Sequence, residues 1–409
     1  MFKEPYKLPV GWQWVKLEGI TRVFSGSSAP QDEDYFTDGK YPFVRVSDLS
    51  SSVDGYITKT RDAINDKAIK ELKLIKAAAG TIVFPKSGAA ILTNARAILA
   101  IDAYIVSHLA ALSPDRSKAD KDWLYYYLST VDMGQYSDNP SYPSLKLARI
   151  KNILIPLPPL SEQKRIVARI NDLFSRIREA KRLRQEAQQE AERLWQSVLA
   201  DTFPKPGTKL PNGWQWVKLE DIAQVFSGSS APQDEDYFTE GKYPFVRVSD
   251  LSSSVDGYIT KTRDAVNDKA IKELKLIKAA AGTIVFPKSG AAILTNARAI
   301  LAIDAYIVSH LAALSPDRSK ADKDWLYYYL STVDMGQYSD NPSYPSLKLS
   351  RIKNIEIPLP NLIKQREIVA YLKCIHEKVQ SMKEAQAQTE AELQRLEQAI
   401  LDKAFLGEL

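Results

Sequence analysis

The stretch Leu8-Pro9-Val10-Gly11-Trp12-Gln13-Trp14 returns 202 residues later as Leu210-Pro211-Asn212-Gly213-Trp214-Gln215-Trp216. Farther along, the copy becomes almost perfect. Among the 125 positions of 23–147 and 225–349, only Asp38/Glu240 and Ile64/Val266 differ. Solenoid repeats have periods of roughly 20–50 residues, so a unit of this size is a domain in its own right. The chain is a tandem duplication, and we expect two similar domains related by a pseudo-two-fold.

The composition describes an ordinary globular protein with a mild positive charge. The 409 residues are 44% hydrophobic and 26% charged, with a formal net charge of +5. This charge permits a polyanionic partner without demanding one. The single cysteine, Cys374, excludes a disulfide framework and a cysteine-based metal site. No run of 18 apolar residues occurs, so we expect no membrane span and a cytoplasmic location.

The first segment of each repeat, 8–150 and 210–352, has the pattern of a mixed α/β domain. Residues 41–46, 81–84 and 101–106 are rich in β-branched and aromatic side chains and are predicted strands. Residues 62–79 and 120–129 are predicted helices, with Gly, Ser and Pro turns between the elements.

The second segment of each repeat predicts a long coiled-coil helix. Residues 161–200 contain neither Gly nor Pro, and apolar residues recur in a heptad frame that the second repeat keeps across five heptads. An ordinary amphipathic core helix is the alternative, but it seldom keeps a 3.5-residue period for so long. The predicted seam consists of Ile166, Ile170, Leu173, Ile177 and Leu194 in the first helix and Ile368, Leu372, Ile375, Val379, Leu393 and Leu396 in the second.

The predicted fold class is α+β, with two mixed α/β domains and two long helices that form an intramolecular antiparallel coiled coil. We place the domains at 1–158 and 205–360, and the helical segments at 159–204 and 361–409. Each helix of about 40 residues would be roughly 60 Å long. Polar Arg184 and Gln386 occupy equivalent seam positions. They either set the register of the coil or mark solvated ends of the seam.

Duplication combined with an antiparallel coil favours a reader of two-part DNA sequences. Two equal readers related by a two-fold match an inverted repeat, because duplex DNA has two-fold axes of the same kind. A rigid coil of roughly 60 Å suits half-sites about one to one and a half helical turns apart, with unread base pairs between them.

The junction between the two kinds of segment resembles a known family. The stretch Ile155-Pro156-Leu157-Pro158-Pro159-Leu160-Ser161-Glu162-Gln163-Lys164-Arg165-Ile166-Val167 is similar to the hallmark that follows each target-recognition domain in specificity subunits of Type I restriction-modification enzymes. The second copy, 357–369, departs at Asn361, Ile363 and Lys364. The domain openings at 8–12 and 210–214, the segments 42–48 and 84–88, and the C-terminal 404–409 are also similar to the family.

The resemblance implies a non-catalytic subunit. It would bind double-stranded DNA, and two adenine methyltransferase subunits would bind along its helices. A restriction subunit with ATP-driven translocation is a further partner that the resemblance allows. The enzyme activities and their cofactors would belong to those partners, so we expect no cofactor, metal or catalytic residue in this chain.

Searches for chemistry in the chain itself support this expectation. Asn139-Pro140-Ser141-Tyr142 and its copy at 341–344 are similar to the amino-methyltransferase motif, but Ser replaces the second Pro and no Gly-x-Gly loop for a methyl donor occurs. The phosphate-loop pattern is also absent. The three histidines, His108, His310 and His376, are too sparse for a zinc site and are predicted core residues. The acidic cluster 32–34 is predicted to be a solvated turn.

Candidate DNA contacts lie on three predicted loops, 25–28, 86–88 and 139–146, because their polar and basic side chains read base edges and bind phosphates. Arg45 and Ser47 are added where a predicted strand ends, and Arg96 after a polar turn. For any one of them a plain surface role is an open alternative, and Arg45 could pair with Asp48. A coiled-coil scaffold without DNA specificity is the alternative for the whole chain. The candidates are Ser25, Ser27, Arg45, Ser47, Lys86, Ser87, Arg96, Tyr142 and Lys146, with their copies Ser227, Ser229, Arg247, Ser249, Lys288, Ser289, Arg298, Tyr344 and Lys348.

Overall fold

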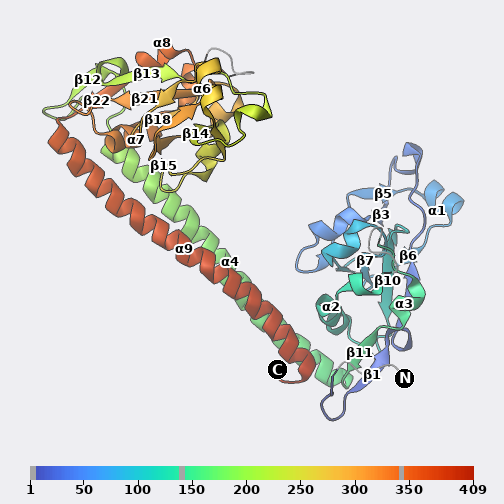
Figure 1. The fold of residues 1–409 in the computed structure, drawn as a ribbon. Helices are drawn as coiled ribbons and strands as arrows, with labels where there is room; N and C mark the ends of the chain where they lie inside the picture. Colours follow the sequence, from blue (N-terminus) through green and yellow to red (C-terminus); the bar gives the residue numbers. More distant parts are fainter. Residues whose placement is uncertain (1–5, 138–142, 340–344) are drawn as a thin grey trace. The chain divides into compact units, whose positions relative to one another are not determined.

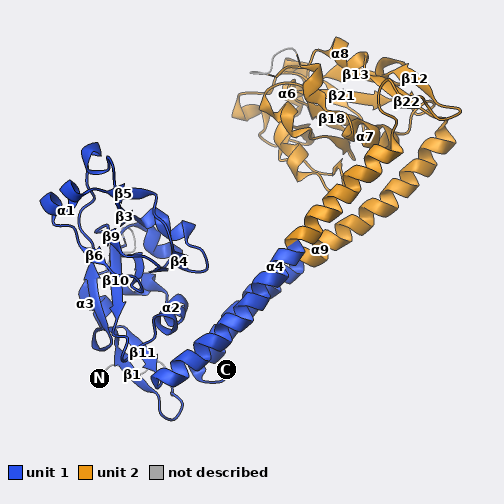
Figure 2. Ribbon diagram, turned by 180° about the vertical axis from the view of Figure 1, so that it is seen from behind, with its two compact units in different colours: residues 1–184, 387–409 blue, residues 185–386 orange. Residues whose placement is uncertain are grey.

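The computed structural model of the chain describes residues 6–137, 143–339 and 345–409 (Figure 1). Its contacts separate two compact units (Figure 2): unit 1 consists of 1–184 with 387–409, and unit 2 of 185–386. Each unit contains one α/β domain and one part of each of two long helices, α4 (Leu160–Thr202) and α9 (Leu362–Leu406).

The domain of unit 1 contains three sheets. Their strand orders are β2-β10-β7-β8-β4, β5-β3-β9-β6 and β1-β11. The elements are β1 (Gln13–Lys16), β2 (Thr21–Ser25), β3 (Tyr41–Val44), β4 (Tyr56–Ile57), β5 (Asp62–Ile64), α1 (Asp66–Leu72), β6 (Lys76–Ala77), β7 (Ile82–Pro85), β8 (Ala97–Leu99), β9 (Ala103–Ile105), β10 (Leu109–Pro114), α2 (Lys121–Thr130), α3 (Leu147–Lys151) and β11 (Leu154–Leu157).

The domain of unit 2 repeats this topology, with orders β13-β21-β18-β19-β15, β16-β14-β20-β17 and β12-β22. The elements are β12 (Gln215–Lys218), α5 (Leu219–Ile222), β13 (Ala223–Ser227), β14 (Tyr243–Val246), β15 (Tyr258–Ile259), β16 (Asp264–Val266), α6 (Asp268–Leu274), β17 (Lys278–Ala279), β18 (Ile284–Pro287), β19 (Ala299–Leu301), β20 (Ala305–Ile307), β21 (Leu311–Pro316), α7 (Lys323–Ser331), α8 (Leu349–Lys353) and β22 (Glu356–Leu359).

The five-stranded sheet is buried on both faces. Along β7, Ile82 and Phe84 belong to a core shared with α2, whereas Val83 belongs to a second core shared with β3 and β9. Successive side chains of a strand point to opposite faces, so one strand contributes to both cores. Such a strand is an unbroken apolar run rather than an alternating one.

One helix prediction holds and another is largely wrong. The helix expected at 120–129 is α2, and the side chain of Asp120 caps it by accepting hydrogen bonds from two backbone N–H groups. The helix expected at 62–79 is only α1, flanked by the short strands β5 and β6. Asn65 caps its start, and Lys73 ends it in a left-handed conformation with φ +50°. The prediction therefore began four residues too early, within β5, and ran seven residues too far, through β6.

In unit 1, the starting part of α4 and the ending part of α9 run antiparallel. Lys181 forms an ion pair with Glu397 at 2.9 Å, and Arg184 forms one with Glu390 at 2.6 Å. Advancing along α4 therefore means moving back along α9. The end of α9 also packs into the domain, where the ring of Phe405 lies 4.9 Å from that of Trp123, edge to face.

In unit 2 the two helices exchange roles. Here the starting part of α9 runs antiparallel to the ending part of α4, with Lys383 paired to Glu192 at 2.6 Å. Phe203, near the end of α4, packs on Trp325 of the domain just as Phe405 packs on Trp123. The predicted pair of mixed α/β domains and the antiparallel pairing of the long helices are thereby confirmed.

The predicted seam positions differ in burial along each helix. Leu194 and Leu396 are 55% and 48% exposed. Each of these two residues follows the first seam residue of its helix by four heptads. The other predicted positions lie inside: Ile166, Ile170, Ile177, Ile368, Leu372 and Val379 are buried, and Leu173, Ile375 and Leu393 are partly buried.

The guanidinium of the polar seam residue Arg184 is only partly hydrogen-bonded. Its Nη1 atom donates to Glu390, while its buried Nε atom has no partner among the described residues. The carbonyl oxygen Oε1 of Gln386 is likewise buried without a partner. Buried polar groups of this kind cost stability and favour one register, as a polar seam residue does in a coiled coil.

No helix in the described part of the chain has both the length and the apolar character that a membrane span requires.

Candidate nucleic-acid interface

Five chain segments of each domain meet at one edge of the two larger sheets. In unit 1, β2 and β7 end where β10 begins, since Ser25 is paired with Ala110 and Pro85 with Leu109. The parallel strands β3 and β9 end beside them, and Val106 donates a backbone hydrogen bond to Val44. We call this the loop edge. Most of the predicted DNA contacts follow these strand ends.

The turn between β9 and β10 is the centre of the loop edge. Its residues Ser107 and His108 form hydrogen bonds with two of the predicted loops. Ser25 Oγ donates to the carbonyl of Ser107 at 3.0 Å, and Ser107 N–H donates to the carbonyl of Ser27 at 2.6 Å. Lys86 N–H donates to the carbonyl of His108 at 2.9 Å. The backbone therefore holds the predicted loops in one place.

His108 was predicted to be a core residue, and that prediction is wrong. The side chain is exposed at the loop edge, and its Nδ1 atom shares a hydrogen bond of 2.6 Å with Ser87 Oγ. An Nδ1 that accepts from the hydroxyl leaves Nε2–H as a donor toward solvent. The polar dipeptide Ser107-His108 just before the apolar strand β10 was the sequence signal for this position.

The third predicted loop joins the same edge. Leu145 N–H donates to the carbonyl of Lys86, and Gly88 N–H donates to that of Pro143, both at 2.8 Å. Lys146 follows as an exposed residue just before α3. Tyr142 and its copy Tyr344 lie outside the described residues, as do the two Asn-Pro-Ser-Tyr motifs.

Arg45 reaches the loop edge but is engaged within the domain. Its Nε atom donates to Asp62, its guanidinium lies over Phe36 and Phe43, and its side chain is 30% exposed. Asp48 instead accepts from the backbone N–H of Arg45, at 2.6 Å, so the expected alternative pairing involves the backbone and not the guanidinium. The neighbouring Ser47 is exposed.

Arg96 does not belong to the loop edge. It is 6% exposed, and its guanidinium donates to the carbonyls of Asn94 and Val131. Burial lowers the pKa of Arg96 to about 10. Its copy Arg298 is 7% exposed with the same two kinds of partner, and burial lowers its pKa to about 10 as well. Both arginines connect parts of the domain interior.

Unit 2 reproduces the loop edge almost atom for atom. His310 is exposed and shares a hydrogen bond of 2.6 Å with Ser289. Ser227 Oγ donates to the carbonyl of Ser309 at 3.1 Å. Lys288 N–H donates to the carbonyl of His310 at 2.8 Å. The copies of the remaining candidates follow: Ser229 accepts from Ile277 N–H, Arg247 donates to Asp264, Ser249 is exposed, and Lys348 precedes α8.

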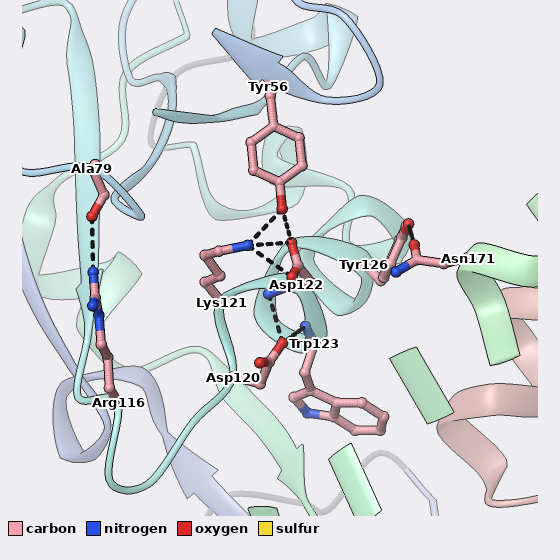
Figure 3. Close-up of polar contacts among 9 residues, drawn as sticks. All are labelled: Tyr56, Ala79, Arg116, Asp120, Lys121, Asp122, Trp123, Tyr126 and Asn171. Carbon is pink, nitrogen blue, oxygen red and sulfur yellow. Dashed lines mark hydrogen bonds and ion pairs between the residues drawn. The ribbon is translucent and has the colours of Figure 1, made fainter. Parts of the chain in front are cut away.

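The opposite edge of the five-stranded sheet connects to the long helix. Figure 3 shows the start of α2 there, with Lys121 bonded to Tyr56 and Asp122. Tyr126, on the same helix, donates to Asn171 of α4 at 2.5 Å. Burial raises the pKa of Tyr126 to about 12, so the phenol remains a donor at neutral pH. This edge anchors the domain to its helix.

The remaining residues that could take part in catalysis or metal binding do not come together in one site. His376 is partly buried on α9 against Trp195, with ring centroids 4.9 Å apart. The acidic cluster 32–34 forms an exposed turn capped by Asp32. Among residues 6–137, 143–339 and 345–409, no group of three or more His, Cys, Asp or Glu side chains could hold a metal ion.

Comparison with known proteins gives the family. A family model described as "Type I restriction modification DNA specificity domain" matches residues 9–189 and again 211–391. The chain is 28% identical to the Type I restriction enzyme MjaIX specificity subunit of Methanocaldococcus jannaschii, over 98% of this chain and 94% of that protein. It is 21% identical to the EcoDI specificity subunit of Escherichia coli, over 98% and 90%.

Solved structures give the same result. A chain from a structure concerned with complex assembly and conformational transition of the type I R-M system superposes with a TM-score of 0.82 at 31% identity, over 99% of this chain and all of that one. The HsdS subunit from Thermoanaerobacter tengcongensis gives 0.62 at 31% identity over the whole of both chains. The chain therefore belongs to the Type I restriction-modification DNA specificity family, as a non-catalytic specificity subunit with two target-recognition domains.

Proposed function

We propose that the two loop edges each read one half-site of a bipartite, palindromic DNA target with an unread spacer between the half-sites. The loop edge gathers hydroxyl, amine, guanidinium and imidazole groups, which are the types that contact base edges and phosphates. We assign reading to the loops of 1–158 and 205–360, and spacing to 159–204 and 361–409.

The observation that carries this proposal is the identity of the two readers. Their sequences differ at two of 125 positions, and the Ser–His hydrogen bond at the centre of each loop edge has the same length of 2.6 Å. Identical surfaces prefer identical base sequences. Readers carried by antiparallel helices would face DNA in opposite senses, which turns two identical half-sites into an inverted repeat.

The interface comprises the described candidates of the loop edge together with His108 and His310, which sequence reasoning missed. We leave out Arg96 and Arg298, because a buried guanidinium bonded to backbone carbonyls cannot reach DNA without unfolding its surroundings. Arg45 and Arg247 would contact phosphate or base only in competition with their aspartate partners.

We further propose the partners that such a subunit serves. Two adenine methyltransferase subunits would bind along the helices, and restriction subunits with translocase activity would join them. The relatives are specificity subunits of restriction enzymes, and the solved type I R-M chain comes from work on complex assembly. The catalysis and its cofactors would lie in those subunits, and the site of action would be the cytoplasm.

Mapping of methylated adenines in the host genome tests the target. We expect one inverted repeat with identical half-sites, and a strain lacking this chain should lose methylation at that motif alone. The same mapping after replacing the unit 2 domain by an unrelated target-recognition domain should convert the motif into an asymmetric one. Two unrelated half-sites for the natural chain would overturn the symmetric reading.

A further inference from the structure

Each domain carries an open pocket at the sheet edge opposite the loop edge. The pocket of unit 1 has a volume of about 490 Å³, and that of unit 2 about 360 Å³. Both form between the end of β10 or β21, a glycine turn and the start of a long helix. Three basic residues line each pocket at equivalent positions: Arg116, Lys121 and Lys164 in unit 1, and Arg318, Lys323 and Arg366 in unit 2.

The charges of the pocket are only partly neutralised. Asp120 is the one carboxylate among the lining residues, and its side chain is engaged in capping α2. Lys121 is held by Tyr56 and Asp122, as Figure 3 shows. Lys164 is exposed and has no ion pair or hydrogen bond to another described side chain. Three cations and one carboxylate give the lining residues a formal charge of +2, of which Asp122, outside the lining, compensates the charge of Lys121.

Arg116 is positioned rather than free. One guanidinium nitrogen donates to the carbonyl of Ala79 at 3.2 Å (Figure 3), which holds the side chain across the turn at Gly80. Gly80 has a φ of +92°, a conformation that L side chains rarely adopt, and a Cβ atom there would lie 3.5 Å from the guanidinium. The glycine is required by this backbone conformation, and the hydrogen bond to Ala79 leaves the other guanidinium nitrogens of Arg116 available to the pocket that it lines.

The drifted helices keep the charge of the pocket although they reverse the charges beside it. Lys164 corresponds to Arg366, so the cation remains. Its neighbours change sign: Glu162 pairs with Arg165 in unit 1, whereas Lys364 pairs with Glu367 in unit 2. Among these three charged positions at the helix start, only the one that lines the pocket keeps its sign in both repeats. This retention points to an anionic ligand shared by both pockets.

We propose that each pocket binds a phosphate group, taken either from the DNA backbone or from a free polyphosphate. Arginine and lysine side chains that converge from a loop, a helix start and a long helix form the kind of cradle that binds phosphate oxygens with charge-assisted hydrogen bonds. A DNA phosphate bound at this edge, away from the reading loops, would add affinity without sequence preference. The DNA source rests on the proposed function, and the free source does not.

The test uses the full chain and two variants of equal charge. The pocket variant is Arg116→Gln, Lys164→Gln, Arg318→Gln and Arg366→Gln. The control variant is Arg176→Gln, Arg182→Gln, Lys378→Gln and Arg395→Gln, all on exposed helix positions. DNA affinity is measured against salt concentration, and tripolyphosphate binding is measured by calorimetry. A milder variant, Lys164→Gln with Arg366→Gln, changes only exposed helix residues and covers the case of a misfolded pocket variant.

If the ligand is a DNA backbone phosphate, the slope of log K against log salt concentration should be shallower by about 2 in the pocket variant than in the control variant. Each of the two pockets would lose one phosphate contact, and each lost contact removes about 0.9 from the slope. If the ligand is a free polyphosphate, tripolyphosphate should bind the natural chain and the control variant, and this binding should be lost in the pocket variant. An unchanged slope together with unchanged or absent tripolyphosphate binding would overturn the pocket. If the natural chain bound DNA without any sequence preference, the proposed function would be overturned. The tripolyphosphate measurement would still show whether the pocket binds phosphate.

Discussion

Gln163 Oε1 accepts a hydrogen bond from the backbone N–H of Asp120 at 2.8 Å, which joins the start of α4 to the start of α2. The amide of Gln163 donates to the carbonyls of Lys118 and Pro158, and the side chain is fully buried. Gln365 makes the equivalent bond to Asp322 at 2.7 Å. The glutamine therefore fixes the direction in which each long helix leaves its domain.

Replacement of Gln163 by Leu should lower the free energy of unfolding of unit 1 by about 2–4 kcal/mol. The change leaves the buried carbonyl of Pro158 without its partner, at a cost of about 1–3 kcal/mol, and the part-buried N–H of Asp120 and carbonyl of Lys118 lose theirs at a smaller cost because water can reach them. Urea unfolding followed by tryptophan fluorescence measures the effect. Gln196→Leu, at an exposed position of the same helix, is the control and should change stability by less than about 0.5 kcal/mol. Equal midpoints for both variants would contradict the role of Gln163.

Arg45→Ala combined with Arg247→Ala should weaken DNA binding about tenfold at moderate salt without unfolding the chain. The loss of one charge-assisted contact in each reader accounts for this size. Because Asp62 and Asp264 hold these arginines, Asp62→Asn with Asp264→Asn should leave affinity equal or higher. Fluorescence anisotropy with a duplex carrying the mapped target measures both. Unchanged affinity in the alanine variant would remove the arginines from the interface.

His108→Ala combined with His310→Ala should lower the affinity for the specific target about fivefold to twentyfold, while the affinity for unrelated DNA changes little. A base-edge hydrogen bond that contributes about 0.5–0.9 kcal/mol in each half-site, or about 1–1.8 kcal/mol over both, corresponds to this range. Competition binding with specific and unrelated duplexes separates the two effects. His376→Ala, which lies on α9 against Trp195, is the matched control and should retain specific affinity. An equal loss on both duplexes would mean that the histidines position the loops without reading sequence.

Lys373→Asn should destabilise unit 2 by about 1 kcal/mol near neutral pH, because it removes the ion pair between Lys373 and Asp324. Asparagine is the residue at the equivalent position of unit 1, Asn171. Burial alone would raise the pKa of Asp324, but hydrogen bonds from Lys323, Lys373 and Tyr258 lower it below the ordinary value of 3.8. A carboxyl whose pKa is lowered in the folded state stabilises the folded unit at pH values above its ordinary pKa. This stabilisation is lost as the pH falls through the folded-state pKa. The difference between variant and natural chain should therefore vanish in strong acid.

Chemical unfolding of both chains across this pH range measures the effect. Lys378→Asn, on an exposed position one and a half turns further along α9, serves as the control with the same change in charge. A pH-independent difference would mean that Lys373 contributes packing rather than its ion pair with Asp324.

Much of the fold was predictable because its signals are local. The repeat sets the number of domains, the heptads predict the paired helices, and Asp120 followed by an apolar turn predicts the start of α2. The family hallmark around Gln163 also lies in one continuous stretch. Between 62 and 79 the local pattern did not record where the helix ends, and the prediction extended beyond both Asn65 and Lys73, which delimit α1.

The membership of the loop edge could not be predicted from spacing. Arg96 and His108 are both polar residues beside turns, yet the first is 6% exposed and the second is exposed at the edge.

The sequence by itself determined that the chain holds two equal domains and two long helices, because repetition and periodicity are properties of the chain alone. Only the tertiary structure decided which polar side chains reach solvent together. That depends on strand pairing over long distances: the pairing of β10 with β2 and β7 brings Ser25, Ser87 and His108 to one edge. The same long-range packing takes Arg96 inside and gathers Arg116, Lys121 and Lys164 at the opposite edge. Burial and proximity arise from contacts between segments far apart in the chain, and no local pattern records them.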